Sequence, residues 1–393
     1  MSYTTEQLRQ FEAVPAEKRE EFRRKRLELR TLDSCFYDVQ KARIEIGNKI
    51  CASYYTQMGV EPGTKKADTL SAEELKILKN FEDEYSLITD ALVDNRGGKV
   101  AKIIASHQVA DASGNMIELS KIRSYSDFVL IAHYLHHKED EIALKKALEM
   151  KLPEYPIYTE FLSNIRGVGP LMAGVIISYF DPYVAKYASS FIKYAGLDPV
   201  VTLDEEGNLK VHGRTNHEED LILRDYVSKK TGKVEQKKST TYNPFVKTKL
   251  VGVLADCFIK AKSDYATCFY HRMHRLNNDV ETADLPYGRK VKIANRYMIN
   301  QFLKDLFVAY RRTEGLPVPM SYEEEFLGKA PHGVIPYKEW MENHPEDTPA
   351  AKKAAREAAE AAKKEEKSEK FREAEAIIEE ELDLLNSASD DED

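Results

Sequence analysis

The sequence predicts a mainly α protein with a helix-hairpin-helix core, one or two small β-hairpins and a long charged C-terminal helix. Three observations support this fold class: apolar residues recur at helical spacing, capping motifs precede several of these segments, and strand-like runs are short and few. At 393 residues the chain can bury a sizeable core. We expect three regions: 1–150, 151–345 and 346–393.

The first of these regions is expected to be mostly helical, with no assigned fold. Two pairs have the spacing of a capping box: Thr4 with Gln7, and Ser71 with Glu74. The predicted helices cover three segments: most of 4–60, 71–93 and about 126–151. Residues 99–119 are ambiguous, and a turn at 113–115 can close a hairpin.

The segment 156–179 is the most informative part of the sequence. Gly167 and Gly169 flank Val168, so the backbone can turn sharply between two apolar runs and approach a ligand closely. Pro170 suits the first position of the second helix. The free amides and positive dipole at that helix start predict an anion site, of the kind that holds a nucleic-acid phosphate. A tight connection within a helical bundle is the open alternative.

After an Asp-Pro break at 181–182, a helix is expected over about 184–195, ending at Gly196. Two short apolar runs, 200–203 and 209–211, predict a small β-ribbon.

Two long helices and a charged tail complete the chain. Apolar and aromatic residues recur at helical spacing over 244–276 and about 291–312, which favours a packed core over a cofactor pocket. From Thr348 onward Ala, Lys and Glu dominate, with opposite charges four residues apart, which favours a solvated single helix. Residues 386–393 are expected to be acidic and disordered.

Charge is distributed unevenly along the chain, whose net charge is −8. Residues 351–393 hold 8 basic and 15 acidic residues, a net of −7. Residues 229–296 hold 15 basic and 6 acidic residues, a net of +9. That block predicts an electrostatic footprint for nucleic acid, with a solvated lysine-rich face as the alternative. The tail can contact a basic partner, screen the basic block or simply aid solubility.

The four cysteines lack Cys-x-x-Cys spacing, which predicts reduced thiols inside the cell. No apolar run reaches membrane-spanning length, and the N-terminus lacks the regions of a signal peptide. We therefore expect a soluble cytoplasmic or nucleoid-associated protein with no membrane partner.

Candidate catalytic and metal sites are weak. His133, His136 and His137 lie near acidic residues, and His271 and His274 lie one helical turn apart, but neither group offers the ligand set that zinc requires. For His271 and His274, a polar helix face that contacts nucleic-acid phosphates is favoured over a zinc site. The chain has no Walker-type loop and no Gly-x-Ser-x-Gly motif. No metal ligand is predicted.

Several sequence blocks resemble a known family. The run Ile165-Arg-Gly-Val-Gly-Pro-Leu-Met-Ala173, with the later Tyr194-Ala-Gly-Leu-Asp-Pro199, is similar to the C-terminal domain of the 110/116/902 group of insertion-sequence transposases. The later blocks resemble a subset of that group: Ala294-Asn-Arg-Tyr297, Glu314-Gly-Leu-Pro317 and the ending Gly328…His332-Gly333. The resemblance covers about residues 155–335.

The resemblance implies DNA binding in transposition or recombination. Family members add a nuclease domain with four metal-binding acidic residues, use a serine nucleophile just after the Gly-Leu-x-Pro element, and work with a guide RNA. Here the first 150 residues show no such acidic set, and no serine occurs between Ser190 and Ser228. Thr202 is the only hydroxyl near the expected place. Catalytic residues are therefore not identified, and Mg²⁺ is expected only if the chain is catalytic.

Three functions remain open from the sequence. The chain is a DNA-binding relative of these transposases or an accessory factor of a mobile element; an active recombinase, metal-dependent or guided by RNA; or a non-catalytic helical interaction scaffold. Homo-oligomers are compatible with each. Under the first hypothesis, these residues hold DNA phosphates: Arg166, Gly167, Val168, Gly169, Leu171, Lys229, Lys230, Lys237, Lys238, Arg272 and Arg275.

Overall fold

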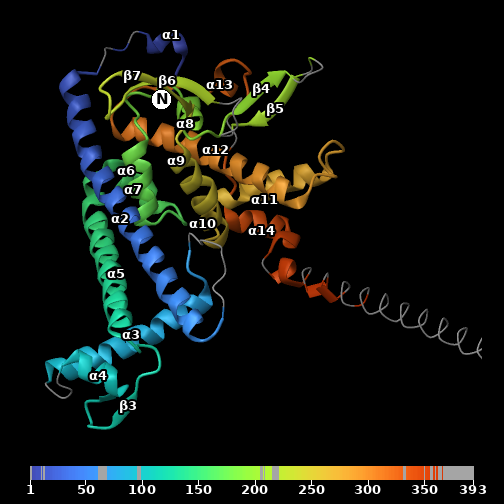
Figure 1. The fold of residues 1–393 in the computed structure, drawn as a ribbon. Coiled ribbons are helices and arrows are strands. Elements are labelled where there is room, and N and C mark those ends of the chain that lie inside the picture. The colour runs from blue at the N-terminus through green and yellow to red at the C-terminus, as the bar shows by residue number, and fades with distance from the viewer. Residues whose placement is uncertain are drawn as a thin grey trace, which may run out of the picture. The chain divides into compact units, whose positions relative to one another are not determined.

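The computed structural model describes residues 2–9, 11, 14–60, 69–94, 99–203, 207, 209–214, 221–330, 333–348, 350–354, 357–358, 360–361 and 365. The protein is mainly helical with small strand pairs, which confirms the predicted fold class at that level (Figure 1). The chain forms two compact units: Met1–Cys257 with Phe302–Pro331, and Phe258–Gln301 with His332–Asp393. In the described part of the chain, no helix is long and apolar enough to cross a membrane.

Three helices form the centre of the first unit: α2 (Ala16–Gln57), α5 (Tyr125–Lys151) and α7 (Pro170–Tyr179). The 42-residue α2 packs against both of the others, and Figure 1 shows it running beside α5. Phe22, Leu29 and Phe36 are buried and lie seven residues apart, so they fall on one stripe of α2. Burial of this stripe is the main force that holds the long helix in the unit.

A second apolar cluster lies where α2 ends, among α3 (Ala72–Val93), α4 (Val100–Ser106), the hairpin β2–β3 (Gln108–Ala110 and Met116–Glu118) and the start of α5. Fully or nearly fully buried side chains include Ile50, Leu78, Phe81, Ile88 and Ile131. The predicted helices over 71–93 and 126–151, and the hairpin around the 113–115 turn, are confirmed here.

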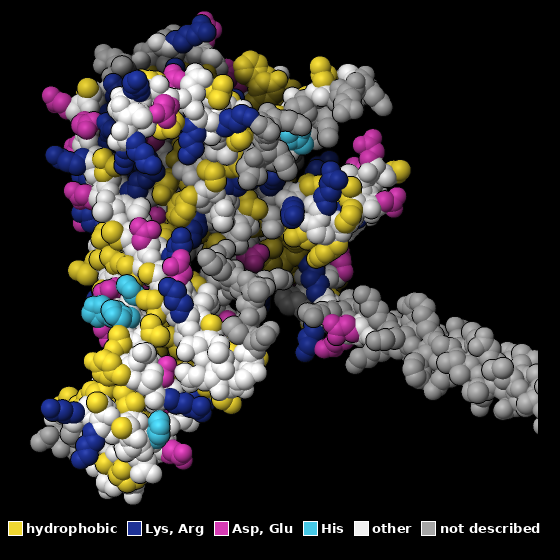
Figure 2. Space-filling model, viewed as in Figure 1, with side chains coloured by type: hydrophobic (Ala, Val, Ile, Leu, Met, Phe, Trp, Pro, Cys, Tyr) yellow, Lys and Arg dark blue, Asp and Glu magenta, His cyan; other side chains and the backbone are white. Residues whose placement is uncertain are grey.

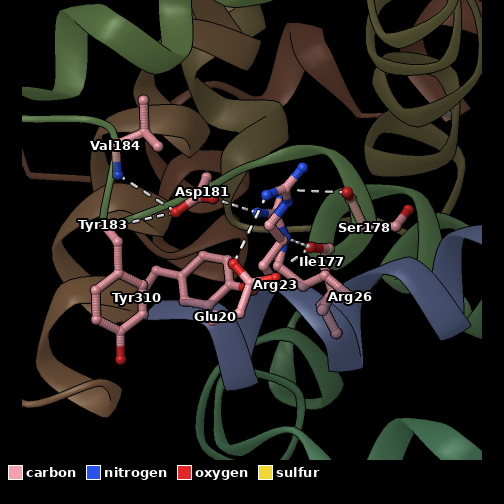
Figure 3. Close-up of polar contacts among 9 residues, drawn as sticks. All are labelled: Glu20, Arg23, Arg26, Ile177, Ser178, Asp181, Tyr183, Val184 and Tyr310. Atoms are coloured by element: carbon pink, nitrogen blue, oxygen red, sulfur yellow. Dashed lines mark hydrogen bonds and ion pairs between the residues drawn. The ribbon is translucent and has the colours of Figure 1, made fainter. Parts of the chain in front are cut away.

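The C-terminal end of α7 is capped by a side chain from α2. Arg26 donates from Nε to the Ile177 carbonyl at 3.0 Å and from Nη2 to the Ser178 carbonyl at 3.1 Å (Figure 3). Its third nitrogen pairs with Asp181, which also accepts the backbone N–H of Tyr183 at 2.9 Å. These bonds satisfy carbonyls that a helix end leaves without partners, and they fix the turn at the Asp-Pro break.

Two antiparallel hairpins follow α8 (Ala188–Tyr194): β4–β5 (Pro199–Leu203 and Leu209–Gly213) and β6–β7 (Leu221–Val227 and Val234–Thr240). The first confirms the predicted ribbon. The second was not predicted, and with β2–β3 it brings the described hairpins to three. The strands of β6–β7 are mostly exposed on both faces, so they lack the apolar-polar alternation by which a half-buried strand is predicted.

The two ends of the first unit meet in a short parallel pair, β1 (Ser2–Tyr3) with β8 (Val318–Pro319). Two one-turn helices flank it, α1 (Thr5–Leu8) and α13 (Tyr322–Glu325). The carboxylate of Glu325 accepts the backbone N–H of Thr5 at 2.7 Å and its hydroxyl at 2.9 Å.

The second unit contains α11 (Tyr265–Asn278), the first half of α12 (Tyr287–Thr313) and α14 (Tyr337–Asn343). Its single tryptophan, Trp340, is buried and donates its indole N–H to Asp347 at 2.9 Å. The long helix predicted over 291–312 is confirmed as part of α12.

The single helix predicted over 244–276 is wrong. The segment forms α9 (Pro244–Lys249), a π-helical turn, α10 (Ala255–Lys260) and then α11. The break falls at Lys262, which has a φ of 54°. No glycine or proline marks this position, so the sequence carries no local signal for it.

One further helix begins later than predicted, and the predicted C-terminal helix lies mostly outside the described residues. The helix predicted from residue 184 begins at Ala188, because residues 182–184 form a turn and residues 186–187 a bend. Most of the predicted C-terminal helix and the acidic end lie outside the described residues.

Candidate nucleic-acid interface

The predicted phosphate-binding turn lies at the start of α7. The short helix α6 (Pro156–Glu160) and a 3-10 turn over Leu162–Asn164 lead into it. Gly167 has a φ of 95°, a conformation that favours glycine, and Gly169 is the exposed residue that caps α7. Pro170 occupies the first helical position, as predicted.

Packing of α7 fixes this turn in place. Every residue from Met172 to Ser178 is buried, and Leu162 on the other side of the turn has no exposed surface. A Cβ atom on Gly174 would lie 2.8 Å from the Leu148 side chain, so α5 and α7 approach each other closely there. Buried residues on both sides thus hold the turn in place, while Gly169 stays exposed.

The electrostatics of the turn favour an anion. Gly169 provides no side-chain cap for the first-turn amides of α7, which include that of the half-buried Leu171. Arg166 is exposed, and within the described residues it has no hydrogen bond or ion pair. Apart from its two chain neighbours, no residue lies within 4 Å of where a Cβ on Gly169 would be, so a ligand can reach the backbone. Val168 is half-buried beside it.

The β6–β7 hairpin carries the other predicted contacts of the first unit. Lys229 and Lys230 lie in its turn, Lys237 and Lys238 lie in β7, and all four are exposed. Residues 221–240 hold 6 basic and 2 acidic residues, a net of +4, in a chain whose net charge is −8. In Figure 2, Lys and Arg side chains lie over the area that β6 and β7 occupy in the same view in Figure 1.

Arg272 and Arg275 belong to the other unit, on α11. Arg275 is exposed, whereas Arg272 is half-buried with its guanidinium carbon 6.0 Å from the centre of the Tyr297 ring. His274 lies 2.9 Å from a carboxylate oxygen of Asp347. This histidine is therefore engaged within its own unit.

The same unit holds a cavity of about 120 Å³, lined by Thr267, Cys268, His271, Tyr297, Gln301, Gly333, Ile335 and Trp340.

The Ala-Gly-Leu-Asp-Pro element has a structural role that the sequence did not reveal. Gly196 ends α8 with a φ of 66°, and a Cβ there would lie 2.5 Å from the Tyr242 ring. Asp198 forms a two-point ion pair with Arg214, at 2.7 and 2.8 Å. Arg214 also donates to the Thr241 hydroxyl at 2.6 Å. The element thus joins the bases of the two hairpins.

One buried carboxyl group was missed altogether. Asp33 on α2 has no exposed surface, and no donor among the described residues reaches either carboxyl oxygen. Burial raises its pKa to about 7, opposed by the positive charges of Lys249 and Arg30. Glu84 is also buried, but backbone N–H groups of residues 120–122 donate to it at 2.7 to 3.0 Å. Asp33 is therefore the unsatisfied one of these two.

The two cations near Asp33 rest on aromatic rings. The Lys249 ammonium lies 3.4 Å from the centre of the Tyr37 ring, and the Arg30 guanidinium carbon lies 4.2 Å from that of Tyr179. Burial lowers the pKa of Lys249. Side chains from α2, α7 and α9 meet in this cluster, so their sequence separation explains why no local motif marked it.

The structure identifies no reaction centre within its described part. No three His, Cys, Asp or Glu side chains there gather to hold a metal ion. Glu141, close in sequence to the histidines 133–137, is paired with Arg43 at 2.8 Å. Thr202 lies in β4 opposite Lys210.

Comparison with protein-family models, with curated proteins and with solved structures found no match to the chain.

Proposed function

We propose that the chain binds duplex DNA through the phosphate backbone and acts in transposition or recombination, or as an accessory factor of a mobile element. Segment 156–179 works as a helix-hairpin-helix whose exposed turn holds a phosphate. The observation that carries this proposal is the open, uncapped first turn of α7 beside the unpaired Arg166.

A phosphate at this turn would meet complementary groups. The first-turn amides can donate to its oxygens, and the helix dipole places partial positive charge at the same point. Arg166 can add a charge-assisted hydrogen bond from the preceding turn. The basic β6–β7 hairpin belongs to the same unit and can contact further phosphates.

Binding of this kind depends on salt because it releases counterions from DNA. If the turn and the hairpin together neutralise about four phosphates, the logarithm of the binding constant falls with that of the salt concentration at a slope of roughly −4. Such contacts set affinity and orientation without reading sequence.

The test is a fluorescence-anisotropy titration of the full chain with a labelled duplex at two salt concentrations. Binding should weaken steeply at the higher salt, and Arg166→Gln should weaken it about threefold to tenfold at the lower salt, since one charge-assisted bond is lost. Lys76→Gln, which removes an exposed charge from α3, is the control and should bind as the wild type does. Salt-independent binding, or no binding by the intact chain, would overturn the proposal.

A further inference from the structure

The β6–β7 hairpin has two distinct faces. Successive side chains of a strand point to opposite faces of the hairpin. The register, which pairs Leu221 with Thr240 and Val227 with Val234, then determines which residues of β6 and β7 share a face. One face, here called the cationic face, consists of Ile222, Arg224, Tyr226, Glu235, Lys237 and Ser239. The opposite face carries Leu223 and Val227, which are 62% and 64% exposed. The rest of the protein therefore buries neither face.

Two positive charges stand directly opposite each other on the cationic face. Arg224 pairs in register with Lys237, and both are exposed. Neither side chain has a hydrogen bond or ion pair with any described residue. Like charges in this position destabilise a strand pair, so an anion between or above them would relieve the repulsion.

The acidic residue on the same face does not neutralise this pair. Glu235 lies nearer the turn and accepts the hydroxyl of Thr231 at 2.8 Å and that of Tyr226 at 2.9 Å. These hydrogen bonds, first that from Thr231, lower the pKa of Glu235. The carboxylate is therefore engaged at the turn, and the Arg224–Lys237 pair stays available to a ligand.

We propose that β6–β7 enters the major groove of B-form DNA with its cationic face toward the base edges. The inference rests on the proposed function and names which surface and which groove are used. Arg224 and Lys237 then lie against guanine edges and adjacent phosphates, while Lys229, Lys230 and Lys233 in the turn reach phosphates at the rim.

The dimensions of the hairpin favour this groove. Two strands lie about 4.8 Å apart, and with side chains they fit a major groove about 12 Å wide, whereas the minor groove is about 6 Å wide. Each strand has seven residues, roughly 24 Å in length. Duplex RNA is disfavoured because the major groove of an A-form helix is deep and narrow.

A protein partner is the competing occupant, since the opposite face exposes Leu223, Val227 and Val234. Charge decides between the two: the hairpin has a net charge of +4, and the unpaired side chains of Arg224 and Lys237 lie on the cationic face. A protein docked on the opposite face would leave the Arg224–Lys237 repulsion unrelieved.

The experiment is dimethyl sulfate footprinting of a short duplex bound to the full chain, since the reagent methylates guanine N7 in the major groove and adenine N3 in the minor groove. The test variant is Arg224→Gln with Lys237→Gln. The matched control is Lys76→Gln with Lys102→Gln, which removes two exposed charges from α3 and α4. Melting temperatures of all proteins verify that they fold.

The wild type and the control should protect guanine N7. The test variant should lose this protection, and its affinity for the duplex should fall at least about tenfold. Protection of adenine N3 alone, or equal affinity for duplex RNA, would overturn the inference. A test variant that binds and protects as the wild type does, while Gly169→Asp abolishes binding, would remove the hairpin from the site and leave the proposed function intact. A wild type that binds no DNA would overturn both.

Discussion

Two glycines of the hairpin region serve different purposes, which substitution can separate. Gly174 faces the fully buried Leu148 at close range, whereas the Cβ position of Gly169 is open. We expect Gly174→Ala to lower the free energy of unfolding by about 1 to 2 kcal/mol, because the clash outweighs the gain in helix propensity. Gly169→Ala should lower it by less than about 1 kcal/mol, because alanine is only a poorer cap. Urea denaturation measures both, and equal losses would contradict this account of the packing.

Asp33 makes the stability of the protein depend on pH. Its pKa in the folded state is about 7, against an ordinary value of 3.8. Between about pH 4 and 7 the folded protein therefore keeps a proton that the unfolded chain has lost. The stabilisation from this group is complete below about pH 4 and is lost as the pH rises through 7, by up to about 4 kcal/mol.

The variant Asp33→Asn should escape this loss, because its side chain does not ionise. Its free energy of unfolding, measured by urea denaturation at pH 5 and pH 8, should rise relative to the wild type at the higher pH. The titratable groups that face Asp33, namely Lys249, Arg30 and Tyr37, are the same in both proteins, so their own titration largely cancels in the comparison. A difference that is the same at both pH values would show that Asp33 is not buried as an uncharged acid.

The residues of the turn before α7 and the buried Asp33 differ in how far the sequence alone can locate them. Gly167, Gly169 and Pro170 were predicted because the chemistry of a turn and a helix start is local. Asp33 could not be predicted, since its environment includes Lys249 on α9 and Gly174 on α7, which are distant in sequence. A lone aspartate in a charged helix looks solvated until its neighbours are known.

At the level of helices, the cap that Arg26 provides for α7 is the contact most open to test. Arg26→Gln breaks a largely buried ion pair with Asp181 and removes donors from two carbonyls. We expect a loss of about 2 to 4 kcal/mol in the free energy of unfolding. Arg23→Gln is the control, because Arg23 is 68% exposed in its pair with Glu20 and should change stability by less than about 1 kcal/mol. Equal effects in thermal denaturation would contradict the capping role.

The extents of α3, which the Ser71–Glu74 capping box marks, and of α5 were predicted closely. Two features were not. The strands of β6–β7 are mostly solvated on both faces and show no alternation, and the break at Lys262 has no glycine or proline to mark it. Both depend on what surrounds the segment, and a local pattern does not contain that information.

For the chain as a whole, the acidic tail should oppose DNA binding through net charge. Deleting residues 351–393 removes a net of −7 from a total of −8. We expect the truncated protein to bind a duplex several-fold more tightly at low salt, with the advantage shrinking as salt screens the charge. Anisotropy titrations of both proteins at two salt concentrations measure this. Identical affinities at low salt would show that the tail does not act on the basic surfaces.

The first turn of α7 is the proposed phosphate site, and Gly169→Asp tests this role most directly. Gly169 caps the helix in an extended conformation, and aspartate is among the best residues for that position, so this variant should be at least as stable as the wild type. Its carboxylate would occupy the free amides and repel a phosphate. Anisotropy titration at low salt, with Gly169→Ala as the control, should show binding weakened at least about tenfold by aspartate and little changed by alanine. If the aspartate variant binds duplex DNA as tightly as the alanine variant does, the turn is not the phosphate site.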